Sequence, residues 1–543
     1  MKKSLKLFAG ILLSLALLVA IGITALVLLV NPNDYKPQLQ TLAAKQNVEL
    51  NIEGNLGWSF YPQLGIHAGK FSIKPPMKDI TKPFQFDSLT VSVKLLPLLH
   101  RQIIVHNVAI RASEISANNT TIKNLLLEAT DLNLDQRAFP LRLSLEASTT
   151  EPPRVIHFKT AAQVSVDEEL KNIALQQLSV QIDDTQLTGD IQATLGNKPF
   201  LKVNLAGTQL DTDNYLSAAG AKTKGAESSR QKTSRDNDEF IPASKILALP
   251  GDYHFTFQDL VLQHLHGAPF DVTLSISREG VMTIKQLKAG AYGGEFSMQG
   301  TIDARPAQPA VALTTAVHNL NLEPAIKDYF QIEKTFASGD FAFTSSVTTR
   351  GLSWNQLMQA IAGEFSFASK AITLDKVDLT SSLDTSLLQL LQVKLPKLMS
   401  GENQTVMTDM VGKGTIQQGV MNNTSLTALG PCMQLNGAGT YNLLSADVLY
   451  HMGITFPSSD TGKDCAEINT RLKDISWPII CKGSLDDGAA KICGADKEAV
   501  QSTVAKSLKK NAGKKLENKL DESLKKKFGE DADTIKNSLK GLF

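Results

Sequence analysis

Residues with the chemistry of a catalytic or metal site are few in this chain. His264 and His266 are two positions apart, which in a strand places both imidazoles on one face and suits a metal pair. The pair lacks a nearby third ligand, so we expect a surface pair with no metal and no other cofactor. The adjacent acids Asp183–Asp184 and Asp486–Asp487 would point to opposite strand faces or lie in turns. They are therefore poor candidates for a carboxylate dyad.

Sequence signatures of common enzymes are also missing. The chain contains no G-x-S-x-G, no Walker loop and no H-E-x-x-H. The glycines of GAYGGEF (290–296) differ from the dinucleotide-binding fingerprint and precede a strand, so they predict a tight turn or bulge. We therefore expect no catalytic residues and no enzymatic activity.

The four cysteines all lie in the last quarter of the sequence, and none has C-x-x-C spacing. Cys481 and Cys493 flank an Asp-Gly turn signal, so a hairpin there would bring them nearly opposite each other. A disulfide between them fits an oxidising compartment, and two buried free thiols are the alternative. Cys432 and Cys465 would form a second, more speculative pair.

Residues 7–30 are the longest apolar stretch, with no charge and only two hydroxyls. A helix of that length would reach ~36 Å, enough to cross a ~30 Å hydrocarbon core with some tilt. A secretory signal peptide is the alternative, but its apolar core would be shorter and would end at a small-x-small cleavage site. Lys2, Lys3 and Lys6 precede the stretch, so we expect a single-pass anchor with a cytoplasmic N-terminus.

The rest of the chain predicts a mainly β protein with a few short helices, such as 34–47, 328–336 and 354–362. Apolar and polar residues alternate with the two-residue period of half-buried strands. The clearest such segments are 48–60, 84–96, 101–112, 141–147, 178–183, 253–263, 311–322 and 339–347.

An internal repeat is visible by eye. Residues 187–216 align with 296–326, and both read as a strand, a Pro-containing turn, a second strand and a helix start. Residues 365–379 and 414–429 look like shorter versions of this hairpin. Repeated strand pairs that bury their apolar face against neighbours predict an elongated, repetitive antiparallel sheet.

We expect five parts in the chain. These are an anchor at 1–30, a first β region at 31–217, a polar linker at 218–239, a second β region at 240–495 and a tail at 496–543. The tail is basic and has an apolar residue every fourth position, which predicts an amphipathic helix. It could lie on a membrane or a partner, or cap the open end of the sheet.

Composition excludes one class of partner. The net charge is +1, from 55 basic and 54 acidic residues, so no overall field attracts nucleic acid. Aromatic residues make up 6% of the chain, too few for base-stacking platforms.

Several segments resemble a known family. NPNDYKPQLQ after the anchor and VELNIEGNLGWSFYPQLG (48–65) are similar to the opening of the AsmA family of bacterial envelope proteins. Residues 96–110, 288–309, 435–454 and 475–485 also fit, so the resemblance extends to about residue 495. The basic tail is not part of it.

The resemblance implies an inner-membrane protein with most of its chain in the periplasm. It also implies a long, curled β-sheet with an apolar concave side, like that of bridge-like lipid transfer proteins. Family members are associated with phospholipid movement between the inner and outer membranes and with outer-membrane assembly. The expected partners are therefore phospholipids, the inner membrane, and the inner leaflet of the outer membrane or envelope assembly proteins.

Alternate strand positions are candidates to line such a groove: Leu141, Leu143, Leu145, Phe255 and Phe257. The closed core of a β-sandwich would give the same alternation, so the sequence leaves the two open. Two functions also stay open. One is a phospholipid carrier, and the other is a periplasmic scaffold or regulator of outer-membrane protein assembly.

Overall fold

The structure is a computed structural model of the chain. It describes residues 31–45, 49–59, 64–74, 83–94, 105–117, 120–132, 138–150, 153–167, 171–196, 199–214, 240–335, 337–375, 383, 404–459, 463–484, 489–506 and 522. The predicted anchor at 7–30, the linker at 218–239 and most of the tail lie outside these residues. Within the described ranges, no helix has the length and apolar character needed to cross a membrane.

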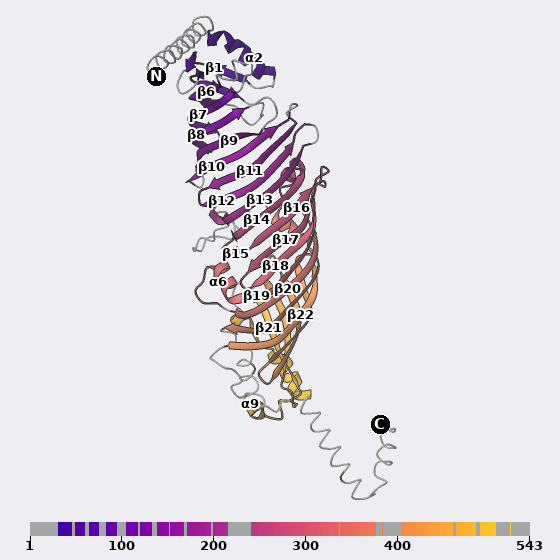
Figure 1. The fold of residues 1–543 in the computed structure, drawn as a ribbon. Helices are drawn as coiled ribbons and strands as arrows, with labels where there is room; N and C mark the ends of the chain where they lie inside the picture. The colour runs from indigo at the N-terminus through magenta and orange to yellow at the C-terminus, as the bar shows by residue number, and fades with distance from the viewer. Residues whose placement is uncertain are drawn as a thin grey trace, which may run out of the picture. The chain divides into compact units, whose positions relative to one another are not determined.

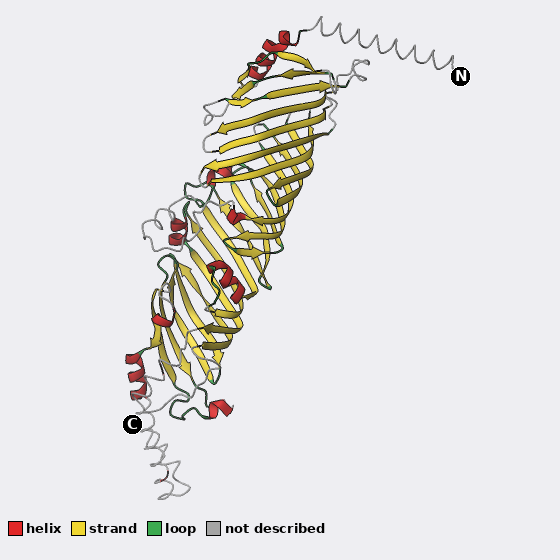
Figure 2. Cartoon of the chain, turned by 90° about the vertical axis from the view of Figure 1, so that its left-hand side faces the viewer, coloured by secondary structure: helices red, strands yellow, loops and turns green. Residues whose placement is uncertain are grey.

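The chain divides into two compact units. Unit 1 comprises Met1–Lys224, Ala248–Gln263 and Ala268–Arg278, and unit 2 comprises Gly225–Leu247, His264–Gly267 and Glu279–Phe543. Each unit is mainly β and contains a large sheet (Figures 1 and 2).

Unit 1 begins with two short helical segments, followed by strands and one 3-10 turn. The elements are η1 (Pro32–Tyr35), α2 (Lys36–Lys45), β1 (Glu49–Ile52), β2 (Leu56–Ser59), β3 (Gly65–Ala68), β4 (Phe71–Lys74), β5 (Phe84–Phe86), β6 (Ser88–Val93), β7 (Val105–Ala117), β8 (Thr120–Leu132), β9 (Phe139–Thr150), β10 (Pro153–Val166), β11 (Asn172–Ile182), β12 (Thr185–Thr194), β13 (Phe200–Asp211), η2 (Thr212–Asn214), β14 (Gly251–Leu262) and β16 (Phe270–Ile276).

The large sheet of unit 1 has the order β2-β3-β6-β7-β8-β9-β10-β11-β12-β13-β14-β16. All neighbours are antiparallel except β13 and β14, which pair in parallel. A parallel pair needs a long crossover, and residues 212–250 supply it. The expected linker therefore lies between two strands of the same sheet. A separate three-stranded sheet has the order β1-β4-β5.

Unit 2 holds most of the short helices. Its elements are α5 (Ala243–Ala248), β15 (Leu265–Gly267), β17 (Val281–Ala291), β18 (Gly294–Asp303), β19 (Ala310–Asn321), α6 (Leu322–Phe330), β20 (Ala337–Arg350), α7 (Trp354–Ala360), β21 (Ala362–Asp375), β22 (Gln404–Gln417), β23 (Val420–Gly430), β24 (Met433–Asn442), β25 (Asp447–Thr455), α9 (Lys463–Ala466), β26 (Ser476–Ser484), α10 (Ala489–Ile492) and β27 (Cys493–Ala495). Strands β17 to β27 pair antiparallel in sequence order.

The predicted repeat appears as two matching hairpins, β12–β13 and β18–β19. Gly189 pairs with Leu205 in the first, and Gly300 pairs with Leu313 in the second. Both glycines have φ above +150°, and a Cβ at either would overlap a carbonyl oxygen of the next strand. Each hairpin ends in a helical segment, η2 or α6, as the sequence alignment predicts.

Two sequence-based boundaries were wrong. The expected helix at 328–336 ends at Phe330, because Gln331 adopts the left-handed conformation and caps α6. Residues 365–375 continue a single strand, β21, instead of turning within a short hairpin. Bulges recur along both sheets, for example between β8 and β9 and between β22 and β23, and bulges bend and twist strands.

Candidate functional site

All five predicted groove residues lie on one face of the unit 1 sheet. Leu141, Leu143 and Leu145 alternate along β9, and Phe255 and Phe257 alternate along β14. Cross-strand partners share a face. One row of such partners joins the two groups: Leu143, Thr160, Val180, Leu187, Gly207 and Phe257.

This apolar face is partly exposed. On β12, Leu187 and Ile191 are partly buried, whereas Gln186 and Asp190 on the opposite face are exposed. Charge on this face lies at a strand end: Arg154, the cross-strand partner of Thr149, lies at the start of β10 and is 3.3 Å from Asp183. Its side chains therefore pack sideways against one another and still present apolar surface to solvent.

The apolar cluster on this face comes from adjacent strands of a single sheet. Its buried members are Ala162, Val164 and Leu178, and its partly buried members are Phe139, Leu141, Val166, Ile173, Leu175, Val180, Ile191 and Leu205. A sandwich core would combine side chains from two facing sheets. Among the described residues, this cluster includes no such second layer.

The five predicted groove residues differ in how deeply their side chains are buried. Phe257 is 9% exposed, because its ring lies across Gly207 of the neighbouring strand; a Cβ at Gly207 would be 2.5 Å from ring atom Cδ1. The side chains of Leu141, Leu143, Leu145 and Phe255 are only partly buried. The leucines and Phe255 are therefore better placed than Phe257 to contact a ligand.

Unit 2 has an aromatic set that sequence reasoning missed. Phe341 and Phe343 on β20 lie beside Phe365 and Phe367 on β21, with ring centroids 6.4–6.5 Å apart and planes within 21°. Phe343 and Phe367 are cross-strand partners, so they share a face. The signal was present in the sequence as two Phe-x-Phe repeats, the same pattern that singled out Phe255 and Phe257.

The apolar face is covered toward the C-terminal end of unit 2. Ile454, Phe456, Leu472, Trp477 and Val500 are each 0% exposed and belong to one core cluster. Residues 497–506 are helical, and Val504 joins Val500 in this cluster. The described start of the basic tail therefore packs into this cluster, and its expected role at the open edge of the sheet stays a prediction.

Both predicted disulfides are confirmed. Cys481 and Cys493 are paired across β26 and β27, and Cys432 bonds to Cys465 within the buried C-terminal cluster. Cys481 and Cys493 are 12 positions apart, and the connection between them contains α10, so it is more than the simple hairpin that the Asp-Gly signal predicted.

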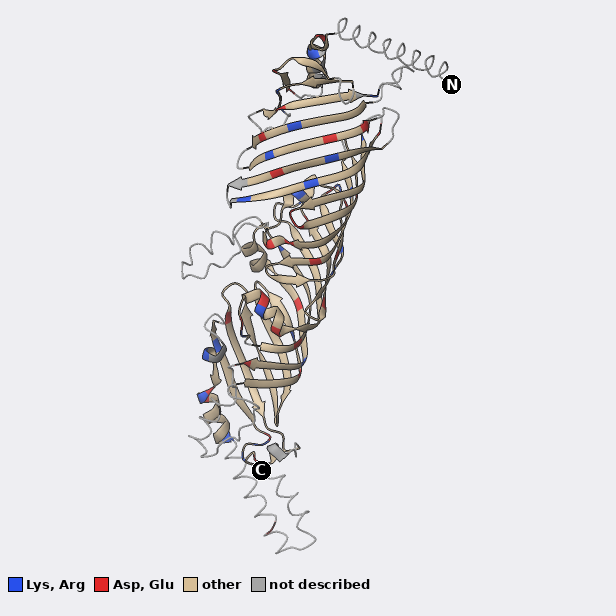
Figure 3. Ribbon diagram, turned by 60° about the vertical axis from the view of Figure 1, so that its left-hand side comes forward, with Lys and Arg blue, Asp and Glu red and all other residues tan. Residues whose placement is uncertain are grey.

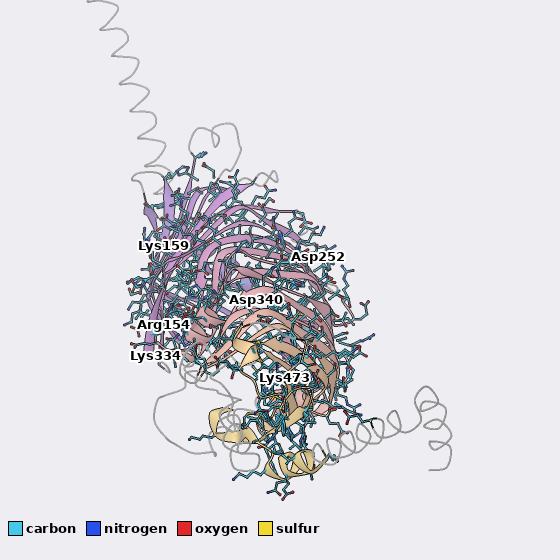
Figure 4. The ribbon with its side chains drawn as sticks, turned by 90° about the horizontal axis from the view of Figure 1, so that it is seen from below. Arg154, Lys159, Asp252, Lys334, Asp340 and Lys473 are labelled. Atoms are coloured by element: carbon cyan, nitrogen blue, oxygen red, sulfur yellow. A yellow bond between two sulfur atoms is a disulfide. The ribbon has the colours of Figure 1, made fainter. Side chains whose placement is uncertain are left out.

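Basic and acidic residues are interspersed along the strands of unit 1 (Figure 3), and Lys159 and Asp252 lie on the face opposite Leu143 and Phe257. Lys159 on β10 and Asp252 on β14, both labelled in Figure 4, are exposed there. Several acids accept backbone N–H groups that bulges or strand ends leave unpaired. Asp190 accepts the N–H of Gln177 at 3.1 Å, and Gln177 has φ of 51°.

Two such carboxylates have lowered pKa values. Hydrogen bonds from the Ser113 hydroxyl and N–H lower the pKa of Asp87. Burial raises the pKa of Asp340, but the N–H groups of Lys370 and Ala371, at 3.1 and 2.9 Å, hold it below its ordinary value. These two carboxylates therefore satisfy backbone N–H groups of their own sheets.

Two neighbouring hollows of about 500 and 510 Å³ lie on the polar face of unit 2. Both are lined by Thr344, Ser366 and Lys413, which are cross-strand neighbours on β20, β21 and β22. The first hollow is also lined by Phe343, Phe367 and Gly412, so its lining is mixed, whereas the lining of the second is mainly polar.

The two histidines do not lie side by side on a strand. His264 has φ of 65° and precedes β15, whereas His266 lies within it. Within the part of the chain that the structure describes, no group of three His, Cys, Asp or Glu side chains has the spacing of a metal site.

The family model described as the AsmA family matches residues 1–124 and 110–426. The chain belongs to the AsmA family. Protein AsmA of Escherichia coli (strain K12) is similar to it, with 24% identity over 438 residues that cover 62% of this chain and 70% of that protein. No solved structure matches the chain significantly.

The match to the AsmA family ends within the C-terminal cluster: Ile372, Leu383, Met407 and Met410 lie inside it, and the other buried members lie beyond residue 426. The segments 435–454 and 475–485 looked family-like in the sequence but lie beyond residue 426. The family match thus covers the apolar face of unit 1 and its candidate residues. Both disulfides and helix 497–506 lie outside it.

Proposed function

We propose that this chain carries phospholipids along its apolar sheet face and so supports outer-membrane biogenesis. In this proposal residues 7–30 anchor it in the bacterial inner membrane as a single span, with a short cytoplasmic N-terminus. The bulk of the chain then lies in the periplasm, curled as an elongated groove between the inner and outer membranes. Membership of the AsmA family supports this setting.

One observation carries the proposal: the apolar cluster of β9 to β13 has no second layer among the described residues, and Arg154 on the same face lies at a strand end. An acyl chain gains about 0.8 kcal/mol for each CH₂ that leaves water. A continuous apolar face can supply that gain along its length, while a charged headgroup stays in solvent. The proposed role needs neither a catalytic residue nor a cofactor.

Photo-crosslinking of the full-length chain in bacterial cells tests the proposal. A benzophenone amino acid at Leu143 should form an adduct with phospholipid, detected by ³²P labelling of the host lipids. The matched control is Arg142, the next residue on β9, which is exposed on the opposite face. Adducts with protein alone at Leu143 would refute lipid carriage.

A scaffold for outer-membrane protein assembly is the second candidate, and one surface favours it. Phe240, Leu247 and Trp354 of unit 2 are 57%, 48% and 44% exposed. The Phe240 and Trp354 rings meet edge to face at 5.4 Å. Exposed aromatic patches are common at protein interfaces. The pair of changes Phe240→Ser and Trp354→Ser should impair outer-membrane protein assembly if this function holds, and leave lipid capture at Leu143 intact.

A further inference from the structure

A ring that lies flat across a glycine recurs on the apolar faces of both units. Phe257 covers Gly207 in unit 1, and in unit 2 Phe367 covers Gly412. Rings in this position protect the exposed backbone of a strand glycine. In this position the aromatic side chain also lies close to the sheet backbone and projects less from the face.

At Gly412, as at Gly207, a side chain and not the backbone blocks a Cβ. The three atoms nearest to a Cβ at this position all belong to the Phe367 ring; Cζ would overlap it, and Cε1 and Cε2 would be 2.6 and 2.8 Å away. At Gly189 and Gly300, by contrast, a backbone oxygen is the nearest obstacle. Gly412 is therefore required by the ring and not by the backbone.

Phe367 lies where two buried regions approach each other. On one side, Phe365 and Ile416 form a buried cluster that α7 joins through Met358. On the other side lies the buried C-terminal cluster, and Phe367 packs against both. Phe367 itself is partly exposed, so its ring presents apolar surface between the two clusters.

We infer that Phe367, held flat by Gly412, sets the clearance for an acyl chain at this point of the apolar face. The inference rests on the proposed lipid carriage. A side chain at position 412 needs about 3.5–4.0 Å from the ring carbons, so the ring would have to leave its place and rise from the sheet. Phe367 is thus a positioning residue for the passage of lipid.

The test combines a blocking variant with its relief. Gly412→Val should lower phospholipid adducts at a crosslinker placed at Val317 by at least fivefold, while adducts at Leu143 in unit 1 stay unchanged. Val317 lies in the same cross-strand row, through Phe343. Phe367→Ala in the Gly412→Val chain should restore the adducts at Val317. Lys413→Val places the same side chain on the opposite face of β22. It should change the adducts neither at Val317 nor at Leu143.

Each outcome decides a separate statement. If Gly412→Val leaves adducts at Val317 unchanged, or Phe367→Ala fails to restore them, the clearance role is wrong and lipid carriage stands. If the parent chain forms no lipid adduct at either position, lipid carriage fails, and the clearance role fails with it. Thermal unfolding of each variant shows whether a lost adduct reflects a lost fold.

Discussion

The stability lost in the variant Leu187→Asp distinguishes an open apolar face from a closed core. Leu187 lies on β12 between Val180 and Gly207 and is partly buried. Full burial of a leucine contributes about 1.5–3 kcal/mol, so a partly buried one should contribute about 1–2 kcal/mol. On an open face the new carboxylate stays hydrated, and Leu187→Asp should cost little more than this.

Ile454→Asp is the reference for a closed core. Ile454 is 0% exposed within the C-terminal cluster, so a carboxylate there would be buried without a partner. That change should cost more than about 4 kcal/mol, since it combines lost packing with an unpaired buried charge. Thr188→Asp, on the exposed face of β12, should cost less than about 0.5 kcal/mol.

Urea unfolding of the full-length chain in detergent micelles measures these differences, with pulse proteolysis to follow each unit. We expect the order Thr188→Asp, Leu187→Asp, Ile454→Asp, with a clear gap before the last. Leu187→Asp should also reduce phospholipid adducts at Leu143 at least fivefold, and Thr188→Asp should not. A loss of stability at Leu187 as large as that at Ile454 would refute an open face.

Three further predictions concern stability. Val500→Asp should destabilise unit 2 by more than about 4 kcal/mol in urea unfolding, because Val500 is fully buried; an unchanged midpoint would show that helix 497–506 does not cap the sheet. Replacing Cys481 and Cys493 by serine should cost about 2–4 kcal/mol, and reductant should then have less effect on the unfolding midpoint than in the parent chain. The pKa of Asp87 is lower in the folded chain than in the unfolded chain. The carboxylate therefore stabilises the fold at pH values above its unfolded pKa, and this stabilisation is lost as the pH falls through its folded pKa. Asp87→Asn should therefore make the free energy of unfolding less dependent on pH below about pH 4. An unchanged pH dependence would contradict a stabilising hydrogen bond from Ser113 to Asp87.

Local pattern predicted the strands well, because alternation is a property of neighbouring residues. The repeat at 187–216 and 296–326, the Cys481–Cys493 pair and the shared face of Leu141, Leu143 and Leu145 along β9 all follow from a two-residue period or a nearby turn. Whether that face is covered depends on distant parts of the chain. The same alternation therefore fitted both a groove and a sandwich.

Long-range pairings were beyond the sequence. The parallel pairing of β13 with β14 joins strands whose first residues, Phe200 and Gly251, are far apart in the chain. The contact of Phe367 with Gly412 joins two strands separated by residues 376–403, and nothing in either segment alone specifies it. Burial of Val500 likewise depends on a cluster built from several strands and α9.

The apolar cluster at the C-terminal end of unit 2 is buried, whereas the apolar face of unit 1 is partly exposed. This difference indicates that the face of unit 1 needs a binding partner to cover it. At the C-terminal end of unit 2, Trp477 donates its indole N–H to Leu472 and lies in a cluster of fully buried side chains. In unit 1, side chains of the same apolar character remain partly exposed across five adjacent strands. Soluble proteins rarely leave contiguous apolar patches larger than a few hundred Å² without an occupant.

An occupant for the open face must be apolar and must need few directional contacts, because the Thr160 hydroxyl on this face already donates to the Ser179 carbonyl. An acyl chain meets both conditions, because it requires no directional hydrogen bond and can shift along the face in small steps. A protein partner would bring backbone N–H and C=O groups that this face cannot satisfy. The chemistry of the face therefore favours lipid over a protein segment as what covers β9 to β13, and assigns protein contacts to surfaces such as that of Phe240 and Trp354.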